Sequence, residues 1–410
     1  MGPITLFDKS FLQSLSINEA VLFDNFFLTN IAPIFFSETL ADLEKAIRKR
    51  RTPEQEVGLI AVKTPEVHSY PNVFHLQLCI DSLLGREVTM DGRIILPGGK
   101  VVKTADQKGI LFDVPPEAEA LERWQRHEFL EVERFYAKKW RSMIGSLNFK
   151  GIKEGLHSIG INTDGCRSLE DAKKISESII DADGFSLERM KFIFIVLGLP
   201  QRIFFRVWQR WGENYCPSLR KFAPYAAFLL MIDLFYYIAM AANLISSEKV
   251  TNRLDISYLY YLPFCMVFVS SDKFHQTCAP MFLRNDQVFI WGFDLKEDLQ
   301  RIDQYYDSLP VEEKEKGLSK IAPWPPDDDN FLVTKIWNKF FPGWRDSSKK
   351  PIDINKDKEK KIVQEIMKFK KAKSIKDQEV DFDISDPDAM LFQRKIQKRR
   401  GKWWQLPKDL

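Results

Sequence analysis

The chain has 410 residues, of which 45% are hydrophobic and 29% are charged, and it carries a net charge of +3 at pH 7. This composition excludes a wholly disordered chain, and the length predicts two domains or one domain with a large insertion. The five cysteines are widely spaced and contain no CxxC pair, so they indicate neither a disulfide framework nor a zinc site, and a reducing, cytoplasmic setting is expected.

The N-terminal segment predicts a strand that ends in an acid. Ile4–Phe7 is a short apolar run, and Asp8, Lys9 and Ser10 follow it directly. Glu38, 30 positions after Asp8, lies in the first turn of a predicted helix. The opening of the chain therefore places one acid after a strand and another at a helix start.

Residues 49–220 depart from this pattern and are predicted to form a mainly helical insertion. Short β-type runs on either side of Pro97-Gly98-Gly99 predict a β-hairpin within it. A long helix is predicted from Pro115 to about residue 143, and further helices follow. One of these, residues 202–211, carries three arginines and two tryptophans, which favours either a nucleic-acid contact or an amphipathic helix whose tryptophans face the core.

Residues 222–245 are apolar, with Asp233 as their only charge, and are long enough to cross a bilayer. Tyr236, Tyr237 and Asn243 are awkward in a helix that faces lipid. A buried core helix without membrane contact is therefore expected, with Asp233 paired inside the protein. A membrane span would instead leave this helix without protein packed around it.

Residues 221–322 form dense apolar segments that alternate between predicted helix and strand. The strand predicted at Cys265–Val269 is preceded by a helix that begins at Asp255. It is followed by a turn that contains Ser270 and Asp272, and then by a further strand and helix. This alternation predicts a parallel sheet with crossover helices.

The acids of these elements are expected to meet at one edge of the sheet, because open α/β sheets bind ligands outside the carboxyl ends of their strands. Clustered carboxylates raise one another's pKa, and Mg²⁺ or Mn²⁺ removes that cost through the hard oxygen ligands that these ions prefer. Each acid taken alone is more simply explained as a helix cap. Taken together, they predict a metal site built from Asp8, Glu38, Asp255 and Asp272.

The order of these acids resembles that of the PIN-domain nucleases. In that family the first strand ends in an aspartate that Ser, Thr or Asn follows within two residues, as in Asp8-Lys9-Ser10. The second acid is a glutamate at a later helix start, and Glu38 matches it. The third acid precedes the last core strand by a helix, as Asp255 does. The fourth lies in a Thr/Ser-x-Asp turn after that strand, here Ser270-Ser271-Asp272.

The resemblance covers about residues 1–48 and 221–310 and does not cover residues 49–220. It implies an α/β fold with a PIN-like, Rossmann-like parallel sheet flanked by helices. The two halves of this core would be residues 1–48 and 221–322, interrupted by the 49–220 insertion. Residues 323–410 would form a linker and a basic C-terminal tail.

The resemblance further implies a metal-dependent endonuclease that hydrolyses phosphodiester bonds in single-stranded or structured RNA. The residues it implies as both catalytic and metal-binding are Asp8, Glu38, Asp255 and Asp272, with Ser10 and Ser270 in support. A toxin–antitoxin or defence setting follows from the same resemblance, with an antitoxin or other regulatory protein as partner. DNA as substrate and an oligomeric state stay open. The alternative is a PIN-like protein without catalytic activity that serves as a nucleic-acid-binding or assembly module.

Basic residues are concentrated in the tail, where residues 349–410 hold 18 Lys and Arg against 11 Asp and Glu. Charge and stacking predict nucleic-acid contacts there and beside the acids, at Lys9, Lys273, Arg399, Arg400, Trp403 and Trp404. Docking of the tail on the chain's own core and binding of a partner protein are the alternatives. His275, three residues after Asp272, is expected to be a surface or capping residue, with a place near the site as the alternative.

Overall fold

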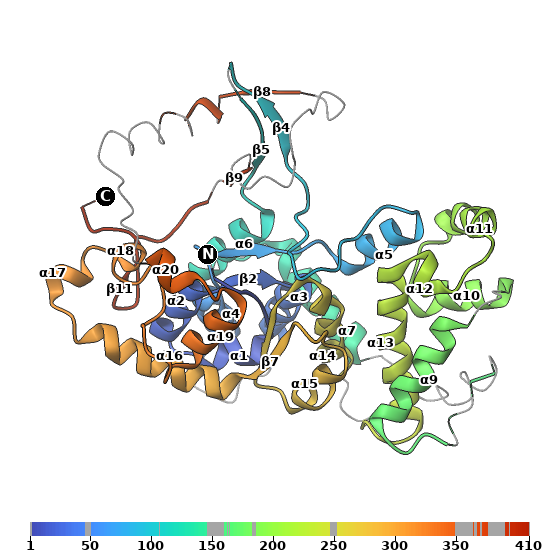
Figure 1. Ribbon diagram of the computed structural model, residues 1–410. Helices are drawn as coiled ribbons and strands as arrows, with labels where there is room; N and C mark the ends of the chain where they lie inside the picture. The colour runs from blue at the N-terminus through green and yellow to red at the C-terminus, as the bar shows by residue number, and fades with distance from the viewer. Residues whose placement is uncertain are drawn as a thin grey trace.

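A five-stranded parallel sheet forms the centre of the protein (Figure 1). In spatial order its strands are β3 (Ser69–Pro71), β2 (Leu28–Ile31), β1 (Ile4–Phe7), β6 (Val267–Ser270) and β7 (Val288–Trp291). Each pair of neighbouring strands is parallel. The fold is therefore α/β and compatible with a Rossmann-like sheet flanked by helices, as predicted. The PIN-like identity and the insertion stay predictions.

The computed structural model describes residues 2–45, 51–105, 107–145, 160–161, 163, 165–182, 186–246, 252–348, 364, 367–369, 371–375, 390–392 and 394–409. The α-helices next to the sheet in sequence are α1 (Lys9–Ser14), α2 (Ile17–Phe26), α3 (Pro33–Leu40), α4 (Pro53–Lys63), α5 (His75–Leu83), α14 (Asn252–Tyr258), α15 (Lys273–Cys278) and α16 (Gly292–Asp307). Short 3-10 helices follow three of them, at η1 (Ala41–Glu44), η3 (Leu259–Phe264) and η4 (Ala279–Met281).

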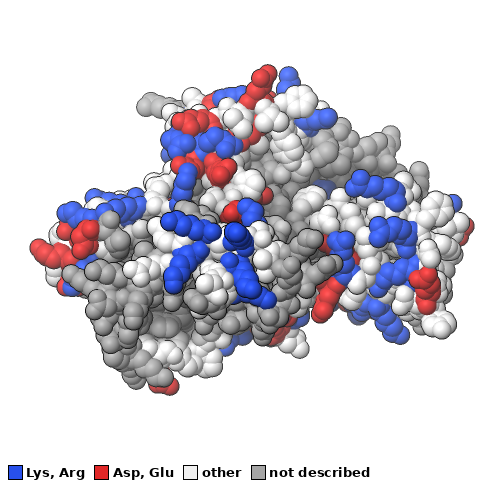
Figure 2. Space-filling model, turned by 90° about the horizontal axis from the view of Figure 1, so that it is seen from above, with Lys and Arg blue, Asp and Glu red and all other residues white. Residues whose placement is uncertain are grey.

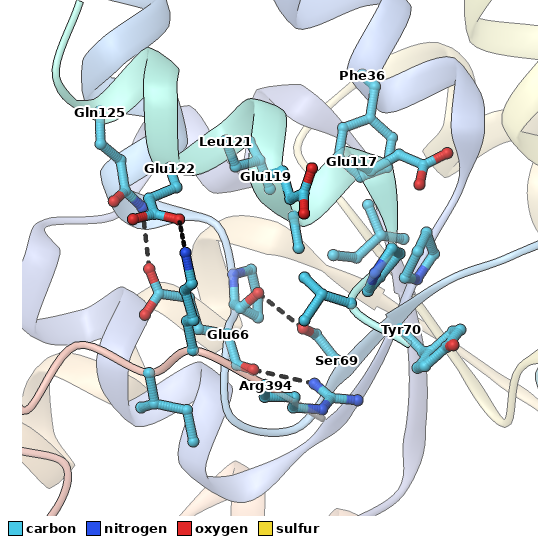
Figure 3. A pocket seen from close by; sticks show the side chains of 18 of the residues that line it. Phe36, Glu66, Ser69, Tyr70, Glu117, Glu119, Leu121, Glu122, Gln125 and Arg394 are labelled. Carbon is cyan, nitrogen blue, oxygen red and sulfur yellow. Dashed lines mark hydrogen bonds and ion pairs between the residues drawn. The ribbon is translucent and has the colours of Figure 1, made fainter. Parts of the chain in front are cut away.

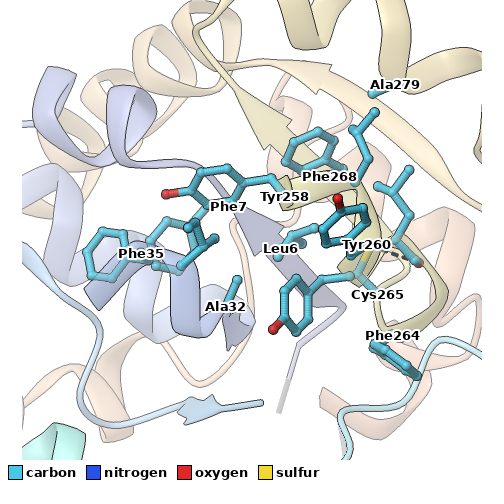
Figure 4. Close-up of a cluster of buried hydrophobic side chains, with 14 of the residues drawn as sticks. Leu6, Phe7, Ala32, Phe35, Tyr258, Tyr260, Phe264, Cys265, Phe268 and Ala279 are labelled. Carbon is cyan, nitrogen blue, oxygen red and sulfur yellow. Dashed lines mark hydrogen bonds between the residues drawn. The ribbon is translucent and has the colours of Figure 1, made fainter. Parts of the chain in front are cut away.

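The strands β1 and β6 form the buried centre of the sheet because almost every residue in them is β-branched or aromatic. Their register pairs Leu6 with Phe268 and Phe7 with Val269, so the two strands end level with each other. Figure 4 shows the apolar cluster around them, to which Tyr258 adds its ring. Burial of each such side chain contributes about 1.5–3 kcal/mol, so the ends of β1 and β6 rest on a rigid base.

A helical lobe lies to one side of the sheet (Figure 1). It consists of α9 (Leu169–Asp181), α10 (Leu187–Val196), η2 (Gln201–Ile203), α11 (Phe204–Glu213), α12 (Leu219–Phe222) and α13 (Pro224–Ala241). By length and composition α13 is apolar enough to cross a membrane, but 78% of that window is buried inside the protein. Its single acid, Asp233, is buried and lies 3.2 Å from the guanidinium of Arg253. The predicted core helix with a paired acid is confirmed.

A hairpin is present, formed by β4 (Lys100–Lys103) and β5 (Lys108–Phe112). Its predicted turn is wrong: the chain reverses after Lys103 rather than at Pro97-Gly98-Gly99, and residues 94–96 form no strand. Two short strands from the C-terminal region, β8 (Lys373–Ser374) and β9 (Met390–Phe392), extend the hairpin to four strands. The single long helix predicted after it is instead two helices, α6 (Pro116–Gln125) and α7 (Glu131–Gly145). The chain breaks between them because His127 takes a left-handed φ of 60°, a conformation that commonly terminates a helix.

The sheet draws on residues that the sequence places in the insertion. β3 is the edge strand beside β2, and α4, which precedes it, packs against α1 and α2. β3 is only three residues long and contains a proline, so it lacks the alternating or apolar run by which a strand is recognised in a sequence. The residues that directly follow the basic run at 48–52 therefore form α4 and then β3, which belongs to the central sheet.

The C-terminal region packs on the chain's own core. It contains α17 (Val311–Lys314), α18 (Leu318–Ile321), α19 (Leu332–Phe340), α20 (Trp344–Ser348), β10 (Arg399–Arg400) and β11 (Trp403–Trp404). The buried indole of Trp337 donates a hydrogen bond of 3.0 Å to the carbonyl of Phe26. Arg400, fully buried, pairs with the buried carboxylate of Asp24 at 3.2 Å. Of the three alternatives for the tail, docking on the core is therefore what the described residues adopt.

Candidate functional site

The sheet reverses its direction of growth between β1 and β6. From β1 the chain proceeds outward through β2 to β3, and the later strands β6 and β7 are added on the other side of β1. Ligands of open α/β sheets bind at such a switch point, outside the carboxyl ends of the two strands. Asp8 follows β1 directly, and Ser270 ends β6, so both lie at this point.

Asp8 is a buried carboxylate that three donors hold in place. Its Oδ1 accepts a 2.9 Å hydrogen bond from the backbone N–H of Phe11, which makes Asp8 the N-cap of α1. Its Oδ2 accepts from the hydroxyls of Ser10 at 2.6 Å and Ser270 at 2.8 Å. Both serines predicted to support the site therefore contact its first acid.

His275 lies buried behind Asp8 and links the two halves of the site. Its Nδ1 is 2.8 Å from the Ser270 hydroxyl and 3.4 Å from Asp8 Oδ2, and its Nε2 is 2.7 Å from the carbonyl oxygen of Asp255. Burial lowers the pKa of His275, but hydrogen bonding and attraction to Asp8 outweigh it and raise the pKa to about 9. The imidazole is thus a cation at neutral pH and donates from both nitrogens, which in turn holds the pKa of Asp8 below its ordinary value despite burial.

Glu38 is held by a phenol and an ammonium group. The hydroxyl of Tyr258 donates to Glu38 Oε2 at 2.7 Å, and Lys9 Nζ lies 3.5 Å from Oε1. The same ammonium lies 3.0 Å from Asp42 Oδ2, and Arg141 contacts the other oxygen of that carboxylate, Oδ1, at 3.2 Å. Lys9 is buried, and burial lowers its pKa, but the attraction of Glu38 and Asp42 raises it above its ordinary value. Lys9 is therefore an internal counterion with no face open to solvent.

Asp255 and Asp272 complete the group from α14 and α15. Asp272 caps α15 by accepting a 2.6 Å hydrogen bond from the N–H of Phe274. Burial raises the pKa of Asp255 to about 8; His275 opposes the increase, whereas Glu38, Asp272 and Asp8 add to it. Because Glu38, Asp272 and Asp8 each repel the charged form of Asp255, these three acids lie within electrostatic reach of it. A common metal site built from Asp8, Glu38, Asp255 and Asp272 stays a prediction.

The chemistry of this donor set suits Mg²⁺ or Mn²⁺, since it offers carboxylate and hydroxyl oxygens and no thiolate. Asp255 is protonated at neutral pH because its charged form is unfavourable in this site. A bound cation would balance that negative charge. Within the described part of the chain, however, no three His, Cys, Asp or Glu side chains are arranged as the ligands of a single ion. Binding of a cation would therefore require the carboxylates to turn toward each other, and those of Glu38, Asp255 and Asp272 are only partly buried.

The predicted nucleic-acid contacts are divided between two places. Lys273, exposed at the start of α15, lies beside the acids. The tail docks elsewhere: Arg400 donates to the carbonyl of Thr64 at 3.0 Å, just before β3, and pairs with Asp24, just before β2. These contacts lie at the amino ends of the strands, opposite the edge that carries the acids.

The side chains of the tail differ in what they leave exposed. Arg400 is buried, and so is Trp403, whose indole donates to Asp303 at 2.7 Å. Arg399 is exposed and lies over the ring of Trp404, 5.3 Å from its centroid. Of the four tail residues predicted to contact nucleic acid, Arg399 and Trp404 are therefore the two that a nucleic acid can reach while the tail stays docked.

Two residues of the site, His275 and Tyr258, were not among the predicted site residues. His275 was expected as a surface or capping residue, and this expectation is wrong because its side chain is fully buried; the alternative, a place near the site, is what the structure has. A signal was present, since His275 lies three residues after the helix cap Asp272 and so on the same helix face as the cap. Tyr258 gave no such signal within its aromatic run, residues 258–261.

A separate cavity of about 200 Å³ lies along the edge strand β3, between α6 and the C-terminal segment (Figure 3). Tyr70, Phe36 and Leu121 supply apolar walls, and Arg394 closes one side by donating 3.0 Å to the carbonyl of Glu66. None of the four acids lines it. The cavity is thus distinct from the acid cluster.

Comparison with known proteins leaves the acid cluster as the main guide to function. The chain matches no family model, no curated protein and no solved structure.

Proposed function

We propose that this protein is a metal-dependent endonuclease with a PIN-like core, acting on RNA. The observation that supports the proposal most strongly is the repulsion that Glu38, Asp272 and Asp8 exert on Asp255 at the sheet's switch point. Four acids from four separate elements are costly to hold together, and perturbed carboxylates of this kind are typical of functional sites. The order of the acids along the chain adds the resemblance to PIN-domain nucleases.

Each residue of the cluster has a task in this proposal. Asp8, fixed by Ser10 and Ser270, is the rigid ligand at the base of the site. Glu38 and Asp272 enter from α3 and from the turn after β6. Asp255, which burial and then the neighbouring acids keep protonated, would serve as a charged ligand if a cation were bound, because a cation favours the deprotonated form.

The ion would supply what the side chains cannot. When bound, Mg²⁺ or Mn²⁺ activates water at neutral pH and stabilises the charge that develops on the scissile phosphate. The exposed ammonium of Lys273 beside Asp272 is placed to attract the phosphate backbone.

A cleavage assay tests this proposal. Labelled single-stranded RNA and DNA are incubated with Mn²⁺ and either the wild-type protein, Asp272→Asn, or the control Asp286→Asn, an aspartate in the exposed turn before β7. We expect RNA cleavage by the wild type and the control, a rate lower by roughly 100-fold or more for Asp272→Asn, and no cleavage in EDTA. Equal rates for all three proteins, or equal rates in EDTA, would refute the proposed site.

A second candidate function is nucleic-acid binding or assembly without catalysis. The observation that favours it is internal neutralisation, since the imidazolium of His275 lies against Asp8 and the ammonium of Lys9 lies against Glu38. A cluster balanced by its own cations is stable without a metal. Binding of RNA with no cleavage by the wild type, in Mn²⁺ as in EDTA, is the result that this candidate predicts.

A further inference from the structure

The outer face of α11, together with Arg202 of the preceding η2, carries exposed cations. Arg202 in η2 and Phe205 and Arg206 in the first turn of α11 lie about one turn apart, and all three are exposed, Phe205 to 81%. Neither arginine has an ion-pair partner among the residues that the structure describes. Figure 2 looks down on this lobe and shows Lys and Arg side chains gathered over it. Two free guanidinium groups therefore flank one exposed ring.

The helix that presents them is firmly anchored on its other side. Trp211 is buried and Phe204 packs on Phe194, with ring centroids 4.9 Å apart. Arg210 lies over the ring of Phe222, 4.3 Å from its centroid, and donates 3.0 Å to the carbonyl of Leu83. The tryptophans of the helix thus face inward, as the amphipathic alternative predicted. The outer face is held in a fixed geometry and loses little entropy when it binds a ligand.

We propose that the outer face of α11 binds a single-stranded segment of nucleic acid through Arg202, Phe205 and Arg206. Arginines neutralise backbone phosphates, and an exposed aromatic ring stacks on a base whatever its identity. A membrane surface fits less well, because a membrane-bound helix turns a broad apolar face outward, whereas the apolar face of α11 is turned inward. This inference rests on the proposed nuclease function, since α11 would hold the polymer that the acids cut.

The position of α11 agrees with that role. The lobe adjoins the carboxyl end of β3, because α5, which begins four residues after the end of β3, packs against α13. The lobe also returns there, since α14, which carries Asp255, is the next described helix after α13. A strand held on α11 can therefore run toward the acids. The tail docks at the opposite edge, so Arg399 and Trp404 are less well placed to guide the same strand.

Binding is measured by fluorescence anisotropy with a labelled oligouridylate of about 15 nucleotides, and with its DNA counterpart, in EDTA so that no cleavage occurs. The test variants are Arg202→Glu/Arg206→Glu and Phe205→Ala. The matched control is Lys335→Glu/Lys339→Glu, which changes the net charge equally on two exposed basic residues one turn apart on α19. Circular dichroism verifies that each variant is folded.

We expect the α11 double variant to bind at least about tenfold more weakly than the control and to reduce the salt slope by about 1.4, since each contact to a single strand contributes about 0.7. Phe205→Ala should weaken binding by about fivefold or more through lost stacking. Binding by the α11 variants equal to that of the control would overturn the inference, and so would a wild type that binds neither oligonucleotide. Binding to vesicles of anionic lipid is measured alongside. If the α11 variants lose binding to these vesicles but not to the oligonucleotides, the inference is overturned in favour of a membrane surface.

The two proposals fail in different ways. If the wild type cleaves RNA and the α11 variants bind as well as the wild type, the nuclease proposal stands and the role of α11 is refuted. If the wild type binds through α11 but does not cleave, the role of α11 in binding stands and the nuclease proposal is refuted.

Discussion

Replacement of Asp255 by asparagine should make the protein more stable at neutral and alkaline pH. The pKa of Asp255 is raised from its ordinary 3.8 to about 8. Between these values the folded protein holds a proton that the unfolded chain has released, so stability falls as pH rises. The fall is about 1.4 kcal/mol per pH unit, or about 3–4 kcal/mol between about pH 5 and 8. Asparagine does not titrate and removes this loss.

Urea denaturation of the wild type and Asp255→Asn in EDTA, at several pH values across this range, measures the effect. The variant should gain on the wild type as pH rises, by about 3 kcal/mol at the upper end. Added Mg²⁺ should stabilise the wild type at pH 8 and the variant much less, because the cation acts by favouring the charged form of Asp255. Two stability curves that stay parallel across the pH range would refute a raised pKa at Asp255.

His275 contributes to the same pH dependence in both proteins. Its pKa is raised from the ordinary 6.5 to about 9, so its contribution to stability is complete below 6.5 and is lost as pH rises through about 9. The comparison of variant with wild type removes most of this shared term and isolates Asp255.

Other predictions concern the packing that supports the site. Arg400→Met should destabilise the protein by about 3–5 kcal/mol in urea denaturation, because it leaves a buried carboxylate unpaired, whereas the exposed neighbour change Arg399→Met should cost less than about 0.5 kcal/mol. Equal effects of the two would contradict the buried pair. Gly292→Ala should cost about 1–3 kcal/mol in thermal unfolding, because the new Cβ would lie 2.2 Å from the Ser271 hydroxyl. Gly343→Ala, with nothing within 4 Å of its Cβ position, is the control, and equal melting temperatures would show that the backbone yields at Gly292.

The acid cluster could be predicted from the sequence because its members mark the ends of recognisable elements. Asp8 and Asp272 follow apolar, β-branched runs, and parallel strands place their carboxyl ends along one edge. The counterions could not be predicted in the same way. Lys9 and His275 are adjacent to the acids in sequence, but only the inward turn of α1 and α15 decides that they are buried and paired rather than exposed.

The limits of the sheet depended on packing that the sequence does not display. β3 is recognisable as a strand only once β2 is beside it, since its three residues have no pattern of their own. The tail reads as basic and polar. Arg400 is nevertheless buried, because it pairs with Asp24, which lies 376 positions earlier in the chain. Long-range ion pairs of this kind leave no local signal.

The most direct test of the central claim is a crystal of the protein soaked in Mn²⁺ and measured for anomalous scattering. The account predicts a peak among Asp8, Glu38, Asp255 and Asp272, and its loss in Asp272→Asn. No peak at this position, with His275 still against Asp8, would contradict a metal site and favour the non-catalytic alternative.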